Sequence, residues 1–109
     1  MTTQQPQQSA ARDWSDVVPK LSELTGSVLF GDIWERPELS KRDRSLITVA
    51  VLTALYRTEQ LRGHIGRALD NGVTREELAE VITHVTFYSG WPTGVNAAQV
   101  AKEVFDQRS

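Results

Sequence analysis

Residues 39–64 read LSKRDRSLITVAVLTALYRTEQLRGH, and this stretch carries the strongest structural signal in the sequence. From Leu46 to Tyr56 every residue is apolar except for two threonines. Ser40 is a good helix N-cap, and Asp43 falls in the first turn, where the helix dipole favours a negative charge. The pattern predicts a helix that is apolar on all sides. Such a helix has to be covered on every side.

The flanking segments carry further helix signals. Residues 14–28 have apolar helical spacing, interrupted by Pro19, which we expect near a first turn; Gly26 or Gly31 is the expected end. Further along, Thr58 is the expected N-cap of one helix, which ends at Asn71 with Gly72 as a left-handed cap. The capping box Thr74–Glu77 begins the next helix, and Gly90 ends it before Pro92. Since no stretch alternates convincingly like a strand, we predict an all-α fold of five or six short helices.

Composition limits the class of protein. The chain has 109 residues and a net charge of −2 with both signs scattered, so we expect one domain and no nucleic-acid partner. The apolar run is too short for a bilayer span, and there is no secretory signal, so we expect no membrane and a cytoplasmic location. Met1–Arg12 is predicted to be a disordered tail before a domain covering residues 13–109.

Three segments together carry a family resemblance: residues 39–64, Gly31–Trp34, and residues 88–97, which read YSGWPTGVNA. They resemble the carboxymuconolactone decarboxylase family, small all-helical enzymes related to the alkylhydroperoxidase D family. The resemblance runs from about Phe30 to the C-terminus. It implies an alkylhydroperoxidase D-like helical bundle assembled as a homo-oligomer, either a trimer or a hexamer built from trimers.

The absence of cysteine separates the two branches of this superfamily. The redox branch carries Cys-x-x-Cys, a histidine four positions later, and a glutamate twelve positions before the first cysteine. Counted back from His64, the cysteine positions fall on Arg57 and Gln60, and the glutamate position falls on Ser45. Thiolate chemistry needs a sulfur nucleophile and a resolving partner. A thiol peroxidase or reductase is therefore opposed by the sequence.

Three residues are candidates for catalysis. His64 lies on the apolar face of its helix, and this position alone favours a histidine of the core. The resemblance instead implies that His64 is a proton donor, because both branches of the superfamily share a histidine here. A histidine near its ordinary pKa exchanges protons at neutral pH. His84 and Tyr88 share one helical stripe and are candidate donors to a substrate oxygen. Packing of both side chains at an interface is an equally good interpretation.

Five residues are candidates for substrate binding. Arg44 and Arg57 flank the apolar helix, and an arginine fork suits a carboxylate. Trp34 and Trp91 fall in loops, where a large ring walls a pocket or packs against a neighbouring subunit. Asn96 either orients a ligand or only packs. The chain has two histidines and no cysteine, so a metal site would also need carboxylates. No His-x-x-His or Glu-x-x-His pair faces one side of a helix, so we predict no metal site.

The resemblance implies a carboxy-lyase without a cofactor. The family's reference substrate is a carboxylated butenolide, 4-carboxymuconolactone, whose own lactone takes up the electrons released by decarboxylation. This implies a role in aromatic compound catabolism through a β-ketoadipate-type pathway. Two alternatives stay open: the same scaffold acting on another lactone or keto acid in secondary metabolism, and a non-catalytic oligomeric binding protein.

Overall fold

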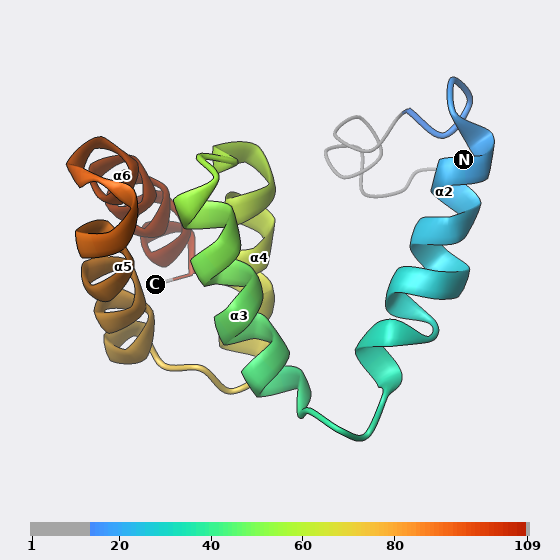
Figure 1. The fold of residues 1–109 in the computed structure, drawn as a ribbon, viewed down its shortest axis with the longest axis horizontal. Helices are drawn as coiled ribbons and strands as arrows, with labels where there is room; N and C mark the ends of the chain where they lie inside the picture. Colours follow the sequence, from blue (N-terminus) through green and yellow to red (C-terminus); the bar gives the residue numbers. More distant parts are fainter. Residues whose placement is uncertain (1–13, 109) are drawn as a thin grey trace. The chain divides into compact units, whose positions relative to one another are not determined.

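The computed structural model describes residues 14–108, and the predicted tail Met1–Arg12 lies outside them. The chain divides after Pro37 into two compact units; helices are labelled as in Figure 1. Every regular element from residue 14 to residue 108 is helical, which confirms the all-α prediction. None of these helices has both the length and the apolar character needed to cross a membrane. The single domain over residues 13–109 stays a prediction.

The N-terminal unit is built from three short helical segments. Helix α2 (Pro19–Leu24) has its proline in the first turn, as predicted. It continues into a π-helix, η1 (Thr25–Phe30), which ends at Gly31, and a 3₁₀ turn, η2 (Ile33–Glu35), follows. A Cβ atom at Gly31 would lie 2.8 Å from two backbone oxygens of η1, so this tight end requires a glycine. The π-helix was not predicted, because apolar spacing over one turn does not distinguish it from an α-helix.

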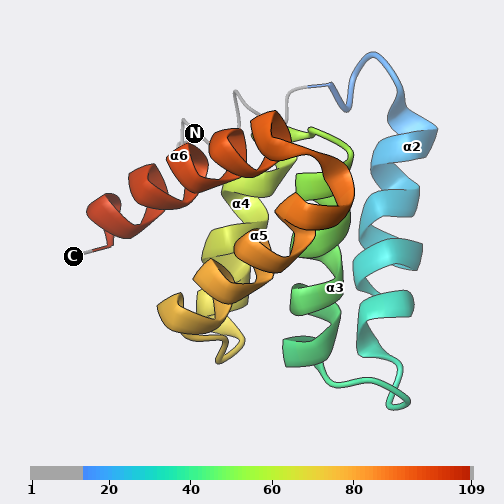
Figure 2. The same cartoon turned by 60° about the vertical axis from the view of Figure 1, so that its left-hand side comes forward.

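The C-terminal unit is a bundle of four helices, α3 (Lys41–Ala54), α4 (Thr58–Asp70), α5 (Arg75–Ser89) and α6 (Trp91–Gln107). Helix α3 packs beside α4 and α5, and α6 packs beside α5 and α4 (Figures 1 and 2). The most deeply buried apolar side chains come from all four helices and the α4–α5 turn; they include Val49, Leu61, Ile65, Ala68, Val73, Leu78 and Ala97.

Most of the predicted helix boundaries are confirmed. The Ser40 hydroxyl accepts from the Asp43 backbone N–H at 3.0 Å, and Thr74 opens α5 with a complete capping box. Gly72 and Gly90 have φ of +97° and +110°, a left-handed region that only glycine adopts at low cost. The Thr58 prediction is wrong by one residue: Arg57 is the N-cap of α4, and no side chain caps it.

The apolar helix α3 is only partly covered by its own chain. It ends at Ala54, two residues earlier than the apolar run suggested. Ser45, Val49 and Thr53 form its buried face, with exposures of 0%, 0% and 1%. Three large residues on other faces stay open to solvent: Ile47 at 51%, Val51 at 48% and Leu55 at 55%. The chain therefore leaves an apolar surface along α3.

Candidate active site

His64 lies near the middle of α4, between the buried residues Leu61 and Ile65. Its own side chain is half-buried, at the edge of the apolar face. Burial lowers the pKa of His64, and the positive charge of Arg67, one turn further along α4, lowers that pKa again. Most of the imidazole is therefore neutral at pH 7. Because its pKa is lowered, its protonated form is a stronger acid than an ordinary histidine.

The predicted arginine clamp is spread along α3 and α4. Arg57 precedes His64 by two helical turns on the same face, about 10 Å along the axis. Arg44 belongs to the opposite end, because its neighbour Ser45 accepts a hydrogen bond of 3.0 Å from Asn71 at the end of α4. The two arginines therefore lie toward opposite ends of the α3–α4 pair. Since about 20 Å along the helix axis separates them, one small substrate cannot contact both arginines within one subunit.

Arg67 is the cation whose charge acts on His64, and it was not singled out from the sequence. Its spacing of three residues from His64 is the signal that could have identified it, because residues three apart on a helix are neighbours. We add Arg67 to the candidate site.

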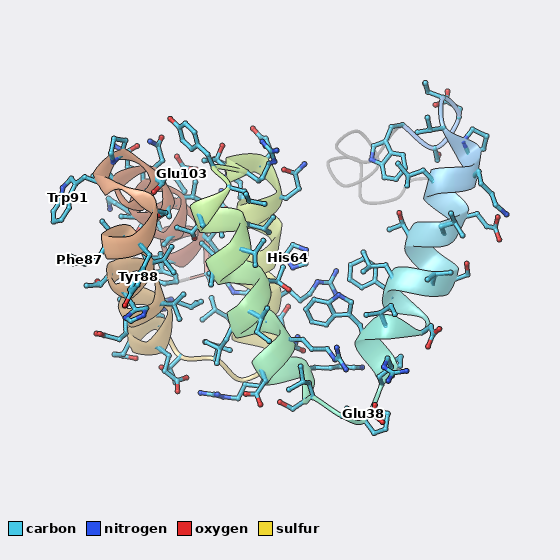
Figure 3. All side chains as sticks on the ribbon, in the orientation of Figure 1. Glu38, His64, Phe87, Tyr88, Trp91 and Glu103 are labelled. Carbon is cyan, nitrogen blue, oxygen red and sulfur yellow. The ribbon has the colours of Figure 1, made fainter. Side chains whose placement is uncertain are left out.

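His84 and Tyr88 form a second group, on α5. Their ring centroids lie 5.1 Å apart with planes tilted by 35°. Tyr88 is 81% exposed and the nearby Trp91 is 64% exposed. Figure 3 shows Tyr88 and Trp91 on one side of the four-helix unit and His64 on the other. One subunit therefore does not bring the three predicted catalytic residues together, and their roles stay predictions.

A groove of about 500 Å³ separates α3 from α5, and His84 is one of its lining residues. Its walls are mainly apolar, and its polar groups are Glu77, Glu80 and His84. Hydrogen bonds from the Thr74 backbone and from Arg42 lower the pKa of Glu77 and keep it ionised. The acidic side chains of this groove were not predicted from the sequence.

The remaining predicted site residues lie elsewhere. The Asn96 side chain donates to the Pro92 carbonyl of its own helix at 2.8 Å, which favours the packing interpretation over ligand binding. The loop prediction for the two tryptophans is wrong: Trp34 lies in η2 of the N-terminal unit, with its ring 5.9 Å from that of Phe30, and Trp91 is the first residue of α6. Between residues 14 and 108, no three histidine, cysteine, aspartate or glutamate side chains are grouped so that they could hold a metal ion.

With the fold and the position of His64 described, the chain can be compared with known proteins. The model of the carboxymuconolactone decarboxylase family matches residues 19–103. The chain belongs to this family. One curated relative is a 4-carboxymuconolactone decarboxylase of Acinetobacter baylyi. It is 46% identical over 70% of this chain.

Two further relatives are less similar to this chain. A nitrosuccinic acid decarboxylase of Metarhizium robertsii is 31% identical over 77% of this chain. An uncharacterized 15.0 kDa protein of Paracoccus denitrificans is 28% identical over 86% of this chain, and the match spans 72% of that protein's length. The chain spans only 57% and 59% of the lengths of the two decarboxylases that it matches.

Proposed function

We propose that this chain is a cofactor-independent decarboxylase of a small carboxylated substrate, with a carboxylated butenolide such as 4-carboxymuconolactone as the best candidate. The observation that carries the proposal is the 46% identity to the 4-carboxymuconolactone decarboxylase of Acinetobacter baylyi. The lack of cysteine supports the decarboxylase branch over the thiol-redox branch.

The chemistry needs little from the protein. When the C–C bond to the γ-carboxylate breaks, CO₂ leaves and the electron pair stays on the ring carbon. That pair is delocalised through the ring alkene onto the lactone carbonyl, so the substrate is its own electron sink. The protein has to hold the carboxylates, stabilise the charge that develops on the lactone oxygen, and deliver one proton to carbon.

We assign the proton delivery to His64. A half-buried imidazole with a lowered pKa gives up its proton readily once it is protonated. Arg57, two turns before His64, is the candidate partner for a substrate carboxylate, since its guanidinium can make a paired hydrogen bond with it. Arg44 lies toward the other end of the α3–α4 pair, about 20 Å along the helix axis, so within one subunit it is the alternative to Arg57 and not its partner. Tyr88, with His84 beside it, lies on the other side of the four-helix unit from His64, so we do not assign these two residues to the same substrate molecule as His64 (Figure 3).

A second candidate substrate class is a nitro-substituted or keto acid. The relative named nitrosuccinic acid decarboxylase favours it. A nitro group on the carbon that bears the carboxylate, or a keto group β to that carboxylate, takes up the released electron pair as the lactone does, so the same proton donor and carboxylate-binding arginine would serve. The chemistry common to both classes is a carboxylate beside a built-in electron sink.

The enzyme is expected to work as a homo-oligomer, a trimer or a hexamer built from trimers. The support from this chain is the apolar surface along α3, where Ile47, Val51 and Leu55 are each about half exposed. Closed association of several copies would remove these side chains from water.

Release of CO₂ tests the proposed reaction. Purified protein is mixed with 4-carboxymuconolactone, nitrosuccinic acid and a β-keto acid, and CO₂ is measured with and without prior treatment with EDTA. We expect release from at least one substrate and the same rate after chelation. Lack of release from all three would refute the decarboxylase proposal, and loss of activity with EDTA would refute cofactor independence.

The pH dependence tests the role of His64. If its protonated form is the donor, kcat falls as the pH rises through the lowered pKa, so the decline begins below the ordinary histidine value of about 6.5. Arg67→Gln removes a charge that disfavours protonation, so this decline should move to higher pH. An identical pH profile in the Arg67→Gln variant would argue against His64 as the titrating group.

A further inference from the structure

The turn between α3 and α4 contains a residue in an uncommon backbone conformation. Tyr56 has a φ of +65°, and between residues 14 and 108 it is the only residue other than glycine with a positive φ. Its backbone N–H donates to the Thr53 carbonyl at 3.1 Å, and the N–H of Arg57 donates to the Leu52 carbonyl at 2.9 Å. This pattern is the Schellman motif, whose left-handed position is usually a glycine and sometimes an asparagine.

A tyrosine at this position is unfavourable for the fold. A bulky side chain with a positive φ is an outlier, because its Cβ atom crowds the following carbonyl oxygen. At two other turns where the chain needs a positive φ, it has Gly72 and Gly90. Strained residues of this kind gather at functional sites. The strain at Tyr56 therefore points to a use for its side chain.

The packing of Tyr56 does not account for the strain. Its side chain is 55% exposed, so much of the ring is open to solvent. Within the described part of the chain, its hydroxyl has no hydrogen-bond partner. Most tyrosine hydroxyls that are used structurally have such a partner. The Tyr56 hydroxyl is therefore available to a ligand.

Tyr56 stands beside the residues assigned to the substrate. It directly precedes Arg57, the N-cap of α4 and the candidate partner of a substrate carboxylate. Arg42 and Arg62 form ion pairs with glutamates, but Arg57 is exposed and has no ion pair with a residue between 14 and 108. His64 follows Tyr56 by eight residues, about 12 Å along the axis at a helical rise. Two long side chains and a small lactone acid can span this distance.

The proposed reaction also needs a group that no residue near His64 has yet supplied. Negative charge develops on the lactone oxygen as CO₂ leaves, and a hydrogen-bond donor has to stabilise it. Tyr88, with His84 beside it, lies on the other side of the four-helix unit from His64 (Figure 3). Tyr56 is a donor on the α3–α4 turn, next to Arg57.

We propose that the Tyr56 hydroxyl donates a hydrogen bond to the oxygen that takes up the electron pair. This is the lactone oxygen, or the nitro or keto oxygen of the second substrate class. Arg57 holds the carboxylate, and His64 remains the group that protonates carbon. The Tyr56 hydroxyl only shares its proton, and its hydrogen bond strengthens as the charge on the oxygen grows. This role rests on the proposed decarboxylase function and adds a third group to it.

Two substitutions separate the hydroxyl from the backbone strain. Tyr56→Phe removes only the hydroxyl, so kcat should fall at least ~100-fold with little change in KM, as expected for one donor to a developing oxyanion. Tyr56→Gly removes the side chain and relieves the strain. Its kcat should fall at least as far, while its melting temperature rises by roughly 2–6 °C. Steady-state kinetics on the substrate with the fastest CO₂ release and thermal denaturation measure these effects.

Phe87→Ala is the control, because it removes another exposed ring, on the side of the four-helix unit away from His64, and it should keep the wild-type kcat. Unchanged kcat in Tyr56→Phe would overturn the inference and leave the proposed function standing. Full activity of Tyr56→Gly with a raised melting temperature would overturn it too, since Tyr56 would then be only a strained helix end. A wild type that releases no CO₂ from any of the three substrates would refute the proposed function, and this role with it.

Discussion

His64→Gln should lower turnover of the true substrate by at least ~100-fold, the lower end of the range for a general acid. Glutamine keeps the ability to hydrogen-bond but cannot supply a proton near neutral pH. The assembly and the melting temperature should stay close to those of the wild type, because the side chain is only half-buried. Steady-state kinetics and thermal denaturation of the same preparation measure both quantities.

A structural role for His64 predicts the reverse pattern. His64→Ala would then lose several degrees of melting temperature and keep most of its activity per folded molecule, since a buried group left without its partner costs about 1–3 kcal/mol. His84→Gln is the comparison variant on the other side of the four-helix unit. If His64→Gln is fully active and His84→Gln is not, the proton donor belongs to the α5 group.

Gly94→Ala should destabilise the folded chain more than any other small substitution in α6. A Cβ atom at this position would lie 1.8 Å from the Thr86 hydroxyl oxygen and 2.8 Å and 2.9 Å from two carbons of the same side chain. Separation of α5 from α6 or rotation of the partly buried Thr86 side chain would be needed, and overpacking of this kind costs about 1–3 kcal/mol. Urea denaturation measures the loss.

Gly63→Ala is the matched control for this prediction. Gly63 is also a helical glycine, but a Cβ atom there would meet no other atom within 4 Å. Alanine should therefore stabilise the chain by about 0.5–1 kcal/mol, because glycine loses more backbone freedom on folding. A second variant, Gly94→Ala with Thr86→Ala, should recover part of the stability. Equal stability of the Gly94→Ala and wild-type chains would contradict the close contact between the helices.

The boundaries of the helices were the most predictable part of the fold. Ser40, Thr74, Gly72 and Gly90 act through hydrogen bonds or backbone angles within a few residues of themselves, so the local sequence contains what determines them. Which face of α3 is buried was harder to predict from the sequence. When nearly every residue of a helix is apolar, periodicity does not reveal that Val49 is buried while Val51 is half exposed.

The candidate site was predictable as a set of residues but not as an arrangement. His64 followed from its family position, and the pairing of His84 with Tyr88 followed from their spacing of one turn. That these two groups lie on opposite sides of the unit depends on how α4 and α5 pack, which involves contacts between residues far apart in the sequence (Figure 3). The influence of Arg67 on His64 is local, so the spacing of three residues could have identified it, although the sequence analysis did not single it out.

The single-residue junction between α5 and α6 limits how far these two helices can move relative to each other. Gly90 alone separates the two helices, and the Ser89 and Thr93 hydroxyls on either side of it are hydrogen-bonded to each other at 2.7 Å. Gly94 packs directly against Thr86, so α5 and α6 also approach each other closely one turn beyond the junction. The exposed rings of Phe87, Tyr88 and Trp91 are therefore presented on a preorganised corner, and binding to them would not incur the entropic cost of ordering a loop.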